Sequence, residues 1–196
     1  RIPAGSRSQA LSSNCALVKE REAQFFSGGD KSIDVSVDDS ITALSTTQNN
    51  FFIAAGDTIQ TFKSDGTPSS AYPVKSEVSA LLGLSNSTGP DSLVVGKTDG
   101  NIQFYSPENG KLVKNLSFNA LTPSPVVNLV QGPGNTTVAA YGNGQIALFY
   151  NQNGSLLEQA HLHGTPEFIA VADQKLIAGT NLGYSTVIDM QEFYQS

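Results

Sequence analysis

One pattern of apolar and polar positions recurs along the chain: an apolar stretch, a glycine, and then a strand of alternating apolar and polar residues that commonly ends on an aromatic. Alternation with a period of two is typical of a β-strand, and a glycine between two such strands is typical of a hairpin turn. Clear copies lie at 51–62, 93–105, 138–149 and 176–188. The pattern therefore predicts a series of antiparallel hairpins.

These copies follow one another at a nearly constant distance. The residues that open the alternating strand are Ile59, Ile102, Ile146 and Val187, at spacings of 43, 44 and 41 residues. A period of roughly 40 to 45 residues with about four strands is typical of a propeller blade, whereas a β-sandwich lacks this repeat and a β-solenoid has shorter repeats. We therefore predict an all-β fold, a β-propeller of four-stranded antiparallel blades in about five repeat units.

The third copy indicates the order of strands within a unit. Strands are predicted at 126–130, 137–141, 145–150 and 155–160. The second strand of each unit is almost entirely apolar, which is typical of a strand covered on both faces. The fourth is more polar, as expected for an exposed edge. Each unit is therefore predicted to run from an apolar inner part to a polar outer edge.

The two ends of the chain fit the repeat less well. A copy that opens at Ile33 lies 26 residues before Ile59, which indicates a truncated first unit, and the last unit stops early, at 191–196. Either these partial units complete one blade together, or another segment or chain completes an incomplete ring. Residues 1–13 are predicted to be a mobile lead-in. The approximate units that follow are 14–37, 38–75, 76–119, 120–160 and 161–196.

Residues 23–190 resemble WD40 and related propeller repeats. The segment from Asp99 to Tyr105 is similar to the turn and strand at the centre of that repeat. Phe62, Tyr105 and Phe149 stand where the tryptophan of the family would fall, but the Trp-Asp and Gly-His pairs are missing and the chain has no Trp. The resemblance implies a divergent WD40-like propeller and matches the class rather than one named family.

The amino-acid composition argues against nucleic acids as binding partners and against insertion into a membrane. Hydrophobic residues make up 39% of the chain and charged residues 14%, which suits strands with polar outer faces better than long solvated helices. The net charge is −6 and no cluster of Lys and Arg appears, so direct nucleic-acid binding is not expected. No apolar run approaches the roughly 20 residues that span a bilayer, so membrane insertion is not expected either.

Cysteine usage and glycosylation sequons bear on the compartment. Cys15 is the single cysteine, so there is no disulfide framework, and we expect an intracellular protein, cytoplasmic or nuclear, rather than a secreted one. Sequons occur at Asn86, Asn115, Asn135 and Asn153. A chain rich in Asn, Ser and Thr acquires some sequons by chance, but they keep a secreted alternative open.

Residues that could carry chemistry are sparse. His161 and His163 are spaced to face one side of a strand and so to reach one metal ion, but a third His is lacking and a polar loop is the preferred interpretation. The acidic residues of 30–39 lack the spacing of a calcium loop and are interpreted as a solvated loop. No nucleophile elbow or phosphate loop appears. We therefore predict a protein that is not an enzyme and has no catalytic, cofactor-binding or metal residues.

The repeat array and the incomplete end units favour a non-catalytic protein-interaction scaffold, a subunit of a larger multiprotein assembly. Its expected partners are other protein subunits, and a partner is one candidate for completing the propeller. A secreted ligand- or glycan-binding propeller is the first alternative, and a propeller hydrolase is the second. The candidate rim interaction loops are those of Asp99, Gly100, Asn143, Leu182 and Tyr184.

Overall fold

Every regular element in the described part of the chain is a β-strand. The computed structural model describes residues 7–11, 14–27, 32–86, 90–108, 111–118 and 123–190. Its strands form five antiparallel sheets, four of four strands and one of three, which we call blades A to E in chain order. The described residues include no helix that could cross a membrane. The predicted all-β propeller fold is confirmed.

Blades A and B are meanders in which each strand pairs with the next one along the chain. Blade A consists of β1 (Arg7–Leu11), β2 (Asn14–Lys19), β3 (Glu22–Ser27) and β4 (Ser32–Ser36). Blade B consists of β5 (Ile41–Thr46), β6 (Asn50–Ala55), β7 (Thr58–Lys63) and β8 (Pro68–Pro73). Gly56 joins β6 to β7 with a φ of 58°, a left-handed conformation that glycine adopts without a side-chain clash.

Blades C, D and E repeat the same meander. Blade C consists of β9 (Val78–Leu84), β10 (Ser92–Lys97), β11 (Ile102–Glu108) and β12 (Lys111–Phe118). Blade D consists of β13 (Val126–Gln131), β14 (Thr136–Tyr141), β15 (Gln145–Tyr150) and β16 (Leu156–His161). Blade E has three strands, β17 (Pro166–Ala172), β18 (Lys175–Thr180) and β19 (Ser185–Asp189). The four strands predicted between 126 and 160 are therefore confirmed to within one residue.

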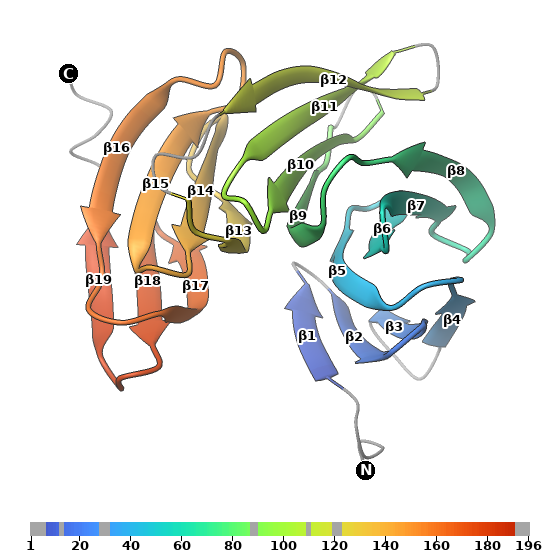
Figure 1. Cartoon of the computed structure of the whole chain (residues 1–196), viewed down its shortest axis with the longest axis horizontal. Helices are drawn as coiled ribbons and strands as arrows, with labels where there is room; N and C mark the ends of the chain where they lie inside the picture. Colours follow the sequence, from blue (N-terminus) through green and yellow to red (C-terminus); the bar gives the residue numbers. More distant parts are fainter. Residues whose placement is uncertain are drawn as a thin grey trace.

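The five blades fan out in chain order along an arc whose two ends are blades A and E (Figure 1). Adjacent blades approach one another through their first strands, β5 against β9, β9 against β13, and β13 against β17. The first strand is therefore the innermost of blades B to E, whereas blade A meets blade B through β2 and β5.

Apolar cores lie between adjacent blades. In the core between A and B, the ring of Phe25 stacks on that of Phe51 with centroids 4.2 Å apart. In the core between D and E, Val138 of β14 meets Ile169 and Leu176 of blade E. Similar cores join B to C and C to D. Because most apolar burial occurs between blades, each blade depends on its neighbours for stability.

The burial of the second strand of a blade shows whether neighbouring blades cover both of its faces. β6, β10 and β14 are buried along nearly their whole length, which confirms the prediction of strands covered on both faces. In β18 the first residues alternate between exposed and buried. The difference arises because, among the described residues, no blade covers the second face of blade E.

The first unit differs from its prediction. Arg7–Leu11 falls within the segment expected to be a lead-in, but it forms β1 and pairs with β2. Blade A therefore has four strands of its own, where a truncated unit was predicted. Ile33 lies in the fourth strand of the blade and not in the third, so the first copy was aligned one strand too late.

The physical reason lies in the turns. The hairpin between the second and third strands of blade A turns at Glu20, which has a φ of 48° without being glycine. Gly28 and Gly29 come after β3 in the sequence, and the pattern therefore placed the hairpin between the second and third strands one strand too late. The sequence of β1 also lacks apolar alternation, so its place in the sheet rests on pairing with β2 rather than on a local pattern.

Candidate functional site

The loops predicted as interaction sites lie on one rim of the blade array. Strands alternate in direction, so the turns between second and third strands share a rim with the connections from each blade to the next. Hydrogen bonds join the two kinds of loop: Leu162 N–H donates to Gly144 O over 2.8 Å, and Asn181 N–H donates to Thr165 O over 3.0 Å. We call this edge of the array the turn rim.

Two of the predicted rim side chains close their own turns. The Asp99 carboxylate accepts the backbone N–H of Asn101 over 2.9 Å and its side-chain amide over 2.8 Å. The Asn143 side-chain oxygen accepts the N–H of Gln145 over 3.1 Å. Gly100 is buried, with a φ of 86°. These residues shape the turn rim more than they present side chains to a partner.

Lys97 adds a charged group beneath this part of the rim. Its side chain is buried at the end of β10, and this burial lowers the pKa of its ammonium, while the nearby Asp99 carboxylate acts in the opposite direction. A buried cation is stabilised by a neighbouring anion. This part of the rim therefore combines a buried cation with the carboxylate that closes the turn.

The other two predicted side chains form an exposed cluster at the junction of blades D and E. Leu182 is 61% exposed and Tyr184 is 54% exposed. The ring of Tyr184 meets that of His163 edge to face, with centroids 5.5 Å apart. The hydroxyl of Thr180 donates to the carbonyl of His163 over 2.9 Å, which fixes the connecting loop against the turn. We call His163, Leu182 and Tyr184 the rim cluster.

The histidine pair is divided between two environments. His163 belongs to the rim cluster, whereas His161 is exposed at the end of β16, opposite Gln145. In the ranges that the structure describes, no group of three or more His, Cys, Asp or Glu side chains is arranged to hold a metal ion.

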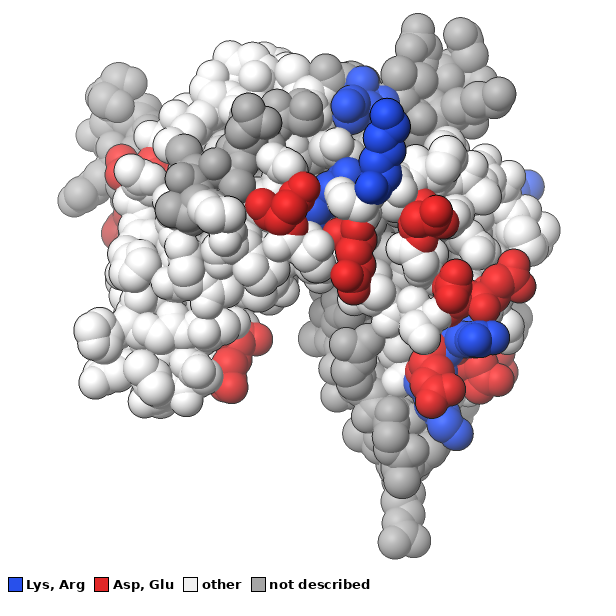
Figure 2. Space-filling model, viewed as in Figure 1, with Lys and Arg blue, Asp and Glu red and all other residues white. Residues whose placement is uncertain are grey.

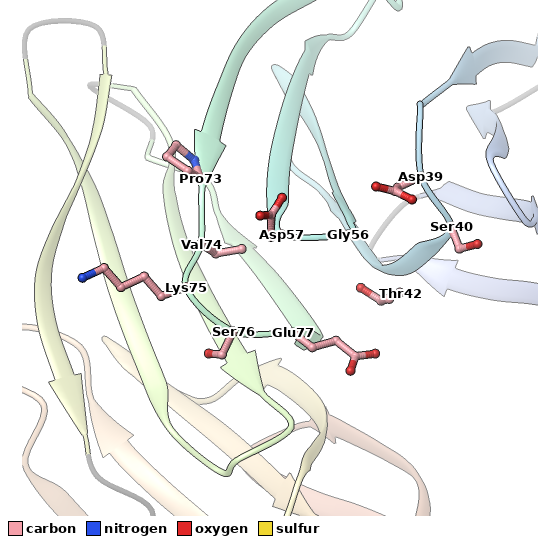
Figure 3. Close-up of a pocket in the computed structure, with 10 residues that line it drawn as sticks. All are labelled: Asp39, Ser40, Thr42, Gly56, Asp57, Pro73, Val74, Lys75, Ser76 and Glu77. Carbon is pink, nitrogen blue, oxygen red and sulfur yellow. The ribbon is translucent and has the colours of Figure 1, made fainter.

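A cavity of about 850 Å³ opens on the turn rim between the loops of blades A, B and C (Figure 3). The carboxylates of Asp39, Asp57 and Glu77 line it together with Lys75. The Asp39 carboxylate lies so close to Gly56 that a Cβ on this glycine would be 2.6 Å from Oδ2. The sequence predicted Asp39 only as part of a solvated loop, because the residues of this cavity come from three separate connections.

A buried carboxylate lies on the opposite rim. Asp91 is 4% exposed and accepts hydrogen bonds from the hydroxyl of Thr47 and from the Asn50 side-chain amide, the latter over 2.7 Å. Asp91 precedes β10 of blade C, while Thr47 and Asn50 form the first turn of blade B. The contact therefore joins the two blades, and no local sequence pattern indicates it because the partners are 41 to 44 residues apart.

The exposed face of blade E has the composition of an inter-blade face. Val187 is 62% exposed, Phe168 is 51% exposed and Ile177 is 36% exposed. Ile177 lies opposite both Ala170 and Val187 in the strand register, so these side chains share one side of the sheet. We call this side, with Phe168, Ala170, Ile177 and Val187, the outer face of blade E.

Blade D shows what such a face looks like when it is covered. Leu148 and Val187 each lie four residues after the glycine of the turn, and they face Val138 and Ile177 respectively on the second strand. Leu148 is 4% exposed and Val138 is 1% exposed, because blade E packs on them. The outer face of blade E therefore carries the same kind of residues without a neighbour among the described residues.

Charge is distributed unevenly around the array. Figure 2 shows acidic side chains, with Lys and Arg side chains among them, grouped over blades A and B on the face that it presents, and few charged side chains over blades D and E. From Val126 to Met190 the charged side chains are Glu158, Glu167, Asp173, Lys175 and Asp189. The outer face of blade E therefore lies in the less charged part of the molecule.

The fold is similar to that of solved propellers. The chain superposes on the WD40 domain of Pan2 from Neurospora crassa with a TM-score of 0.73 and 12% identity, over 96% of this chain and 63% of that one. It superposes on the WD40 β-propeller domain of Doa1 with a TM-score of 0.68 and 17% identity, over 96% and 66%. It also superposes on the computationally designed protein Ika4 with a TM-score of 0.65 and 22% identity, over 83% and 99%.

The chain thus spans less than two thirds of the two WD40 domains and nearly the whole of Ika4. No protein-family model matches the sequence, and a search of curated proteins finds no match. At these identities the likeness supports the fold alone, a divergent WD40-like propeller of which the described residues form five blades.

Proposed function

We propose that this chain is a non-catalytic protein-interaction scaffold that acts as a subunit of a larger assembly. The observation that carries the proposal is the outer face of blade E, where Phe168, Ile177 and Val187 are exposed side by side. Contiguous apolar surface on a soluble protein commonly marks a contact with another protein. The low charge around it also suits an interface core, which is depleted of charged residues.

The rim cluster is the second proposed contact. Leu182 and Tyr184 project from a turn that hydrogen bonds hold against the loop of His163. A loop fixed on rigid sheets presents its side chains with little ordering cost, and exposed aromatic residues are common anchors in interfaces. The scaffold would therefore offer partners one lateral face and one rim.

Native particle mass tests the proposal. Phe168→Glu places a charge on the outer face of blade E, and Ser36→Glu places one at an exposed position on the side of blade A that faces away from blade B. We expect the wild-type chain and Ser36→Glu to be recovered from the source cells in a particle larger than the monomer, with reproducible partner chains. Phe168→Glu should lose those chains while it keeps a wild-type circular dichroism spectrum.

Leu182→Asp separates the two proposed contacts. Loss of a partner with Leu182→Asp alone would assign that partner to the rim cluster, and loss with Phe168→Glu alone would assign it to the outer face. A wild-type chain that is monomeric and carries no partner in its source cells would contradict the scaffold function.

The cavity on the turn rim supports a second candidate function, a binding module for a small polar ligand such as a glycan. Hydroxyl groups of Ser40, Thr42 and Ser76 line it beside the carboxylates of Asp39 and Asp57. Such groups supply the donors and acceptors that a hydroxyl-rich ligand needs. A glycan array probed with the wild-type chain and with Asp57→Ala tests this function, and failure of the wild-type chain to bind would remove it.

A further inference from the structure

In the part of the chain that the structure describes, blade E has one strand fewer than the other blades. In blades A to D the third strand pairs with a fourth, which is β4, β8, β12 or β16. Among the described residues, β19 pairs with β18 alone. The edge of blade E is therefore a third strand, whose counterparts in the other blades are covered.

The hydrogen bonds at the ends of β18 and β19 show how the backbone of β19 is oriented. Thr180 N–H donates to the carbonyl of Tyr184 over 2.9 Å, and Met190 N–H donates to the carbonyl of Gln174 over 2.8 Å. Hydrogen-bonded and non-hydrogen-bonded pairs alternate along an antiparallel ladder. The even-numbered residues from 184 to 190 therefore direct their backbone groups toward β18.

The odd-numbered residues have the opposite orientation. The N–H and C=O groups of Ser185 and Val187 point to the side where the other blades carry a fourth strand. In blade D, Tyr150 has this orientation on β15, and its N–H donates to the carbonyl of Ser155 over 2.9 Å, where the pairing with β16 begins. The edge of β19 thus presents the donors and acceptors that a further strand needs.

An apolar crevice lies beside this edge, between blades D and E. Its cavity of about 20 Å³ is lined by Leu148 and Ala160 of blade D and by Ile188 and Met190 of blade E, among others. Ile188 belongs to the apolar cluster between the two blades, so its side chain points toward blade D. A residue paired with Ile188 on a fourth strand would share that side of the sheet and would cover the crevice.

Blade D provides the template for that residue. Phe149 lies five residues after the glycine of its turn, as Ile188 does, and Leu156 of β16 is its cross-strand partner. An aliphatic residue opposite Ile188 would reproduce this pair. Glu158 and Gln159 stand two and three positions further along β16, so polar residues are tolerated near this pair.

We propose that β19 binds an extended peptide segment of a partner protein by antiparallel strand addition, with an aliphatic side chain of the peptide opposite Ile188. The partner segment has no proline in its paired stretch, because each inward N–H has to reach a carbonyl of β19. Polar or charged residues are allowed two or three positions away from the aliphatic one, as Glu158 and Gln159 are on β16 at the same crevice. This contact uses the strand edge and is independent of the outer face of blade E.

A synthetic peptide with the sequence of residues 154–162 is the probe, because this segment forms the fourth strand of blade D. Fluorescence anisotropy of the labelled peptide with the wild-type chain should show saturable binding. In blade D, Glu158 and Ala160 lie opposite Leu148 and Ile146, so their N–H groups face β15. N-methylation at these two positions should weaken binding by about tenfold or more.

The matched control peptide carries the N-methyl groups at Gln159 and His161, whose N–H groups face away from β15. It should bind within about twofold of the unmodified peptide, because the paired edge is unchanged. Equal weakening by both modifications, or no saturable binding of the unmodified peptide, would overturn the proposal.

Variants of the chain test the other side of the contact. Val187→Pro removes an outward N–H, a place where an edge strand tolerates proline, and should weaken peptide binding by about tenfold. Val187→Thr keeps the N–H and should change affinity by about twofold or less. Ser185→Pro repeats the test should Val187→Pro alter the circular dichroism spectrum. An unchanged affinity in a folded proline variant would overturn strand addition.

Phe168→Glu separates this contact from the scaffold function. The side chain of Phe168 lies on the outer face and not at the edge of β19, so the peptide should bind this variant as it binds the wild type. Loss of cellular partners with Phe168→Glu and retention of the peptide would therefore distinguish the two surfaces.

Discussion

The two ends of the blade array differ in the faces that they expose. At blade E the exposed face is apolar, with Phe168 and Val187 more than half exposed. At blade A the side away from blade B carries Asp34 and Ser36, both exposed, and Gln24, whose amide donates to the Ser32 hydroxyl over 3.2 Å. One end of the array exposes large apolar side chains, and the other exposes polar side chains beside the half-buried Leu17 and Phe26.

This difference bears on self-association. A ring of copies joined end to end would place the outer face of blade E on the polar side of blade A and would bury Asp34 against apolar side chains. Burying an unpaired carboxylate costs more than the apolar contact returns. Contacts at the blade E end are therefore expected with a different partner, which is consistent with the proposed scaffold function.

The largest difference in the free energy of unfolding is expected when a charge is placed on the covered face of blade D and, separately, on the outer face of blade E. Leu148→Asp places a carboxylate in the core between blades D and E, where the side chain is 4% exposed, and should destabilise the fold by more than about 4 kcal/mol. Val187→Asp, at the corresponding but 62% exposed position, should cost about 1 kcal/mol or less. Urea unfolding followed by circular dichroism measures both, and equal costs would show that the outer face is covered in solution.

A smaller difference in the free energy of unfolding is expected when a buried phenylalanine of blade A and an exposed one of blade E are each replaced by alanine. Phe25→Ala removes the ring stacked on Phe51 in the core between blades A and B and should cost about 3 to 5 kcal/mol. Phe168→Ala, at a position that is 51% exposed, should cost about 1 kcal/mol. The free energy of unfolding in urea is the measurement, and a large loss for Phe168→Ala would place that ring in a core.

A pH dependence is expected from Tyr141, which is buried in the core between blades C and D and has no counterpart on the exposed outer face of blade E. Burial raises the pKa of Tyr141 to about 12, against roughly 10 for a tyrosine in an unfolded chain. The unfolded state therefore loses its proton first, so the stabilisation is complete below pH 10 and is lost as the pH rises toward 12, by about 2 to 3 kcal/mol. Tyr141→Phe should lose less stability than the wild type between pH 9 and about pH 11.5 in urea titrations.

The smallest effect concerns dye binding at the two ends. Phe168→Ser should lower the fluorescence of an apolar-surface dye such as ANS, because it removes the largest exposed ring on the outer face of blade E. Phe26→Ser changes the matching side of blade A, where the ring is half-buried opposite Ser32, and should have less effect. A larger decrease in ANS fluorescence with Phe26→Ser than with Phe168→Ser would show that blade A, and not blade E, exposes the larger apolar surface.

Much of the fold could be predicted because blade strands carry local signals. The spacing of Ile59, Ile102 and Ile146 and the glycines beside them located the hairpins of blades B, C and D. Blade A was misaligned because its hairpin turns at Glu20, which carries no glycine signal. The local pattern therefore locates a hairpin whose turn contains glycine, and it misses a hairpin that turns at another residue type.

The candidate sites were less predictable than the strands. Leu182 and Tyr184 were chosen because they occupy a repeated turn, and the structure places them beside His163 on the turn rim. The cavity with Asp39, Asp57 and Glu77, and the buried contact of Asp91 with Thr47, had no sequence signal. Each joins residues from separate connections or blades, so its existence depends on how the blades pack.

By itself the sequence determined the hairpins of blades B to E and the period of the blades, because alternation and glycine turns act over a few residues. The tertiary structure alone decided which faces are covered. Leu176, Ile177 and Ala178 are as apolar as Val138, Ala139 and Ala140, yet Ile177 is 36% exposed and Val138 is 1% exposed. The difference comes from a neighbouring blade, contributed by residues distant in the chain, and a strand's own sequence carries no record of whether that neighbour is present.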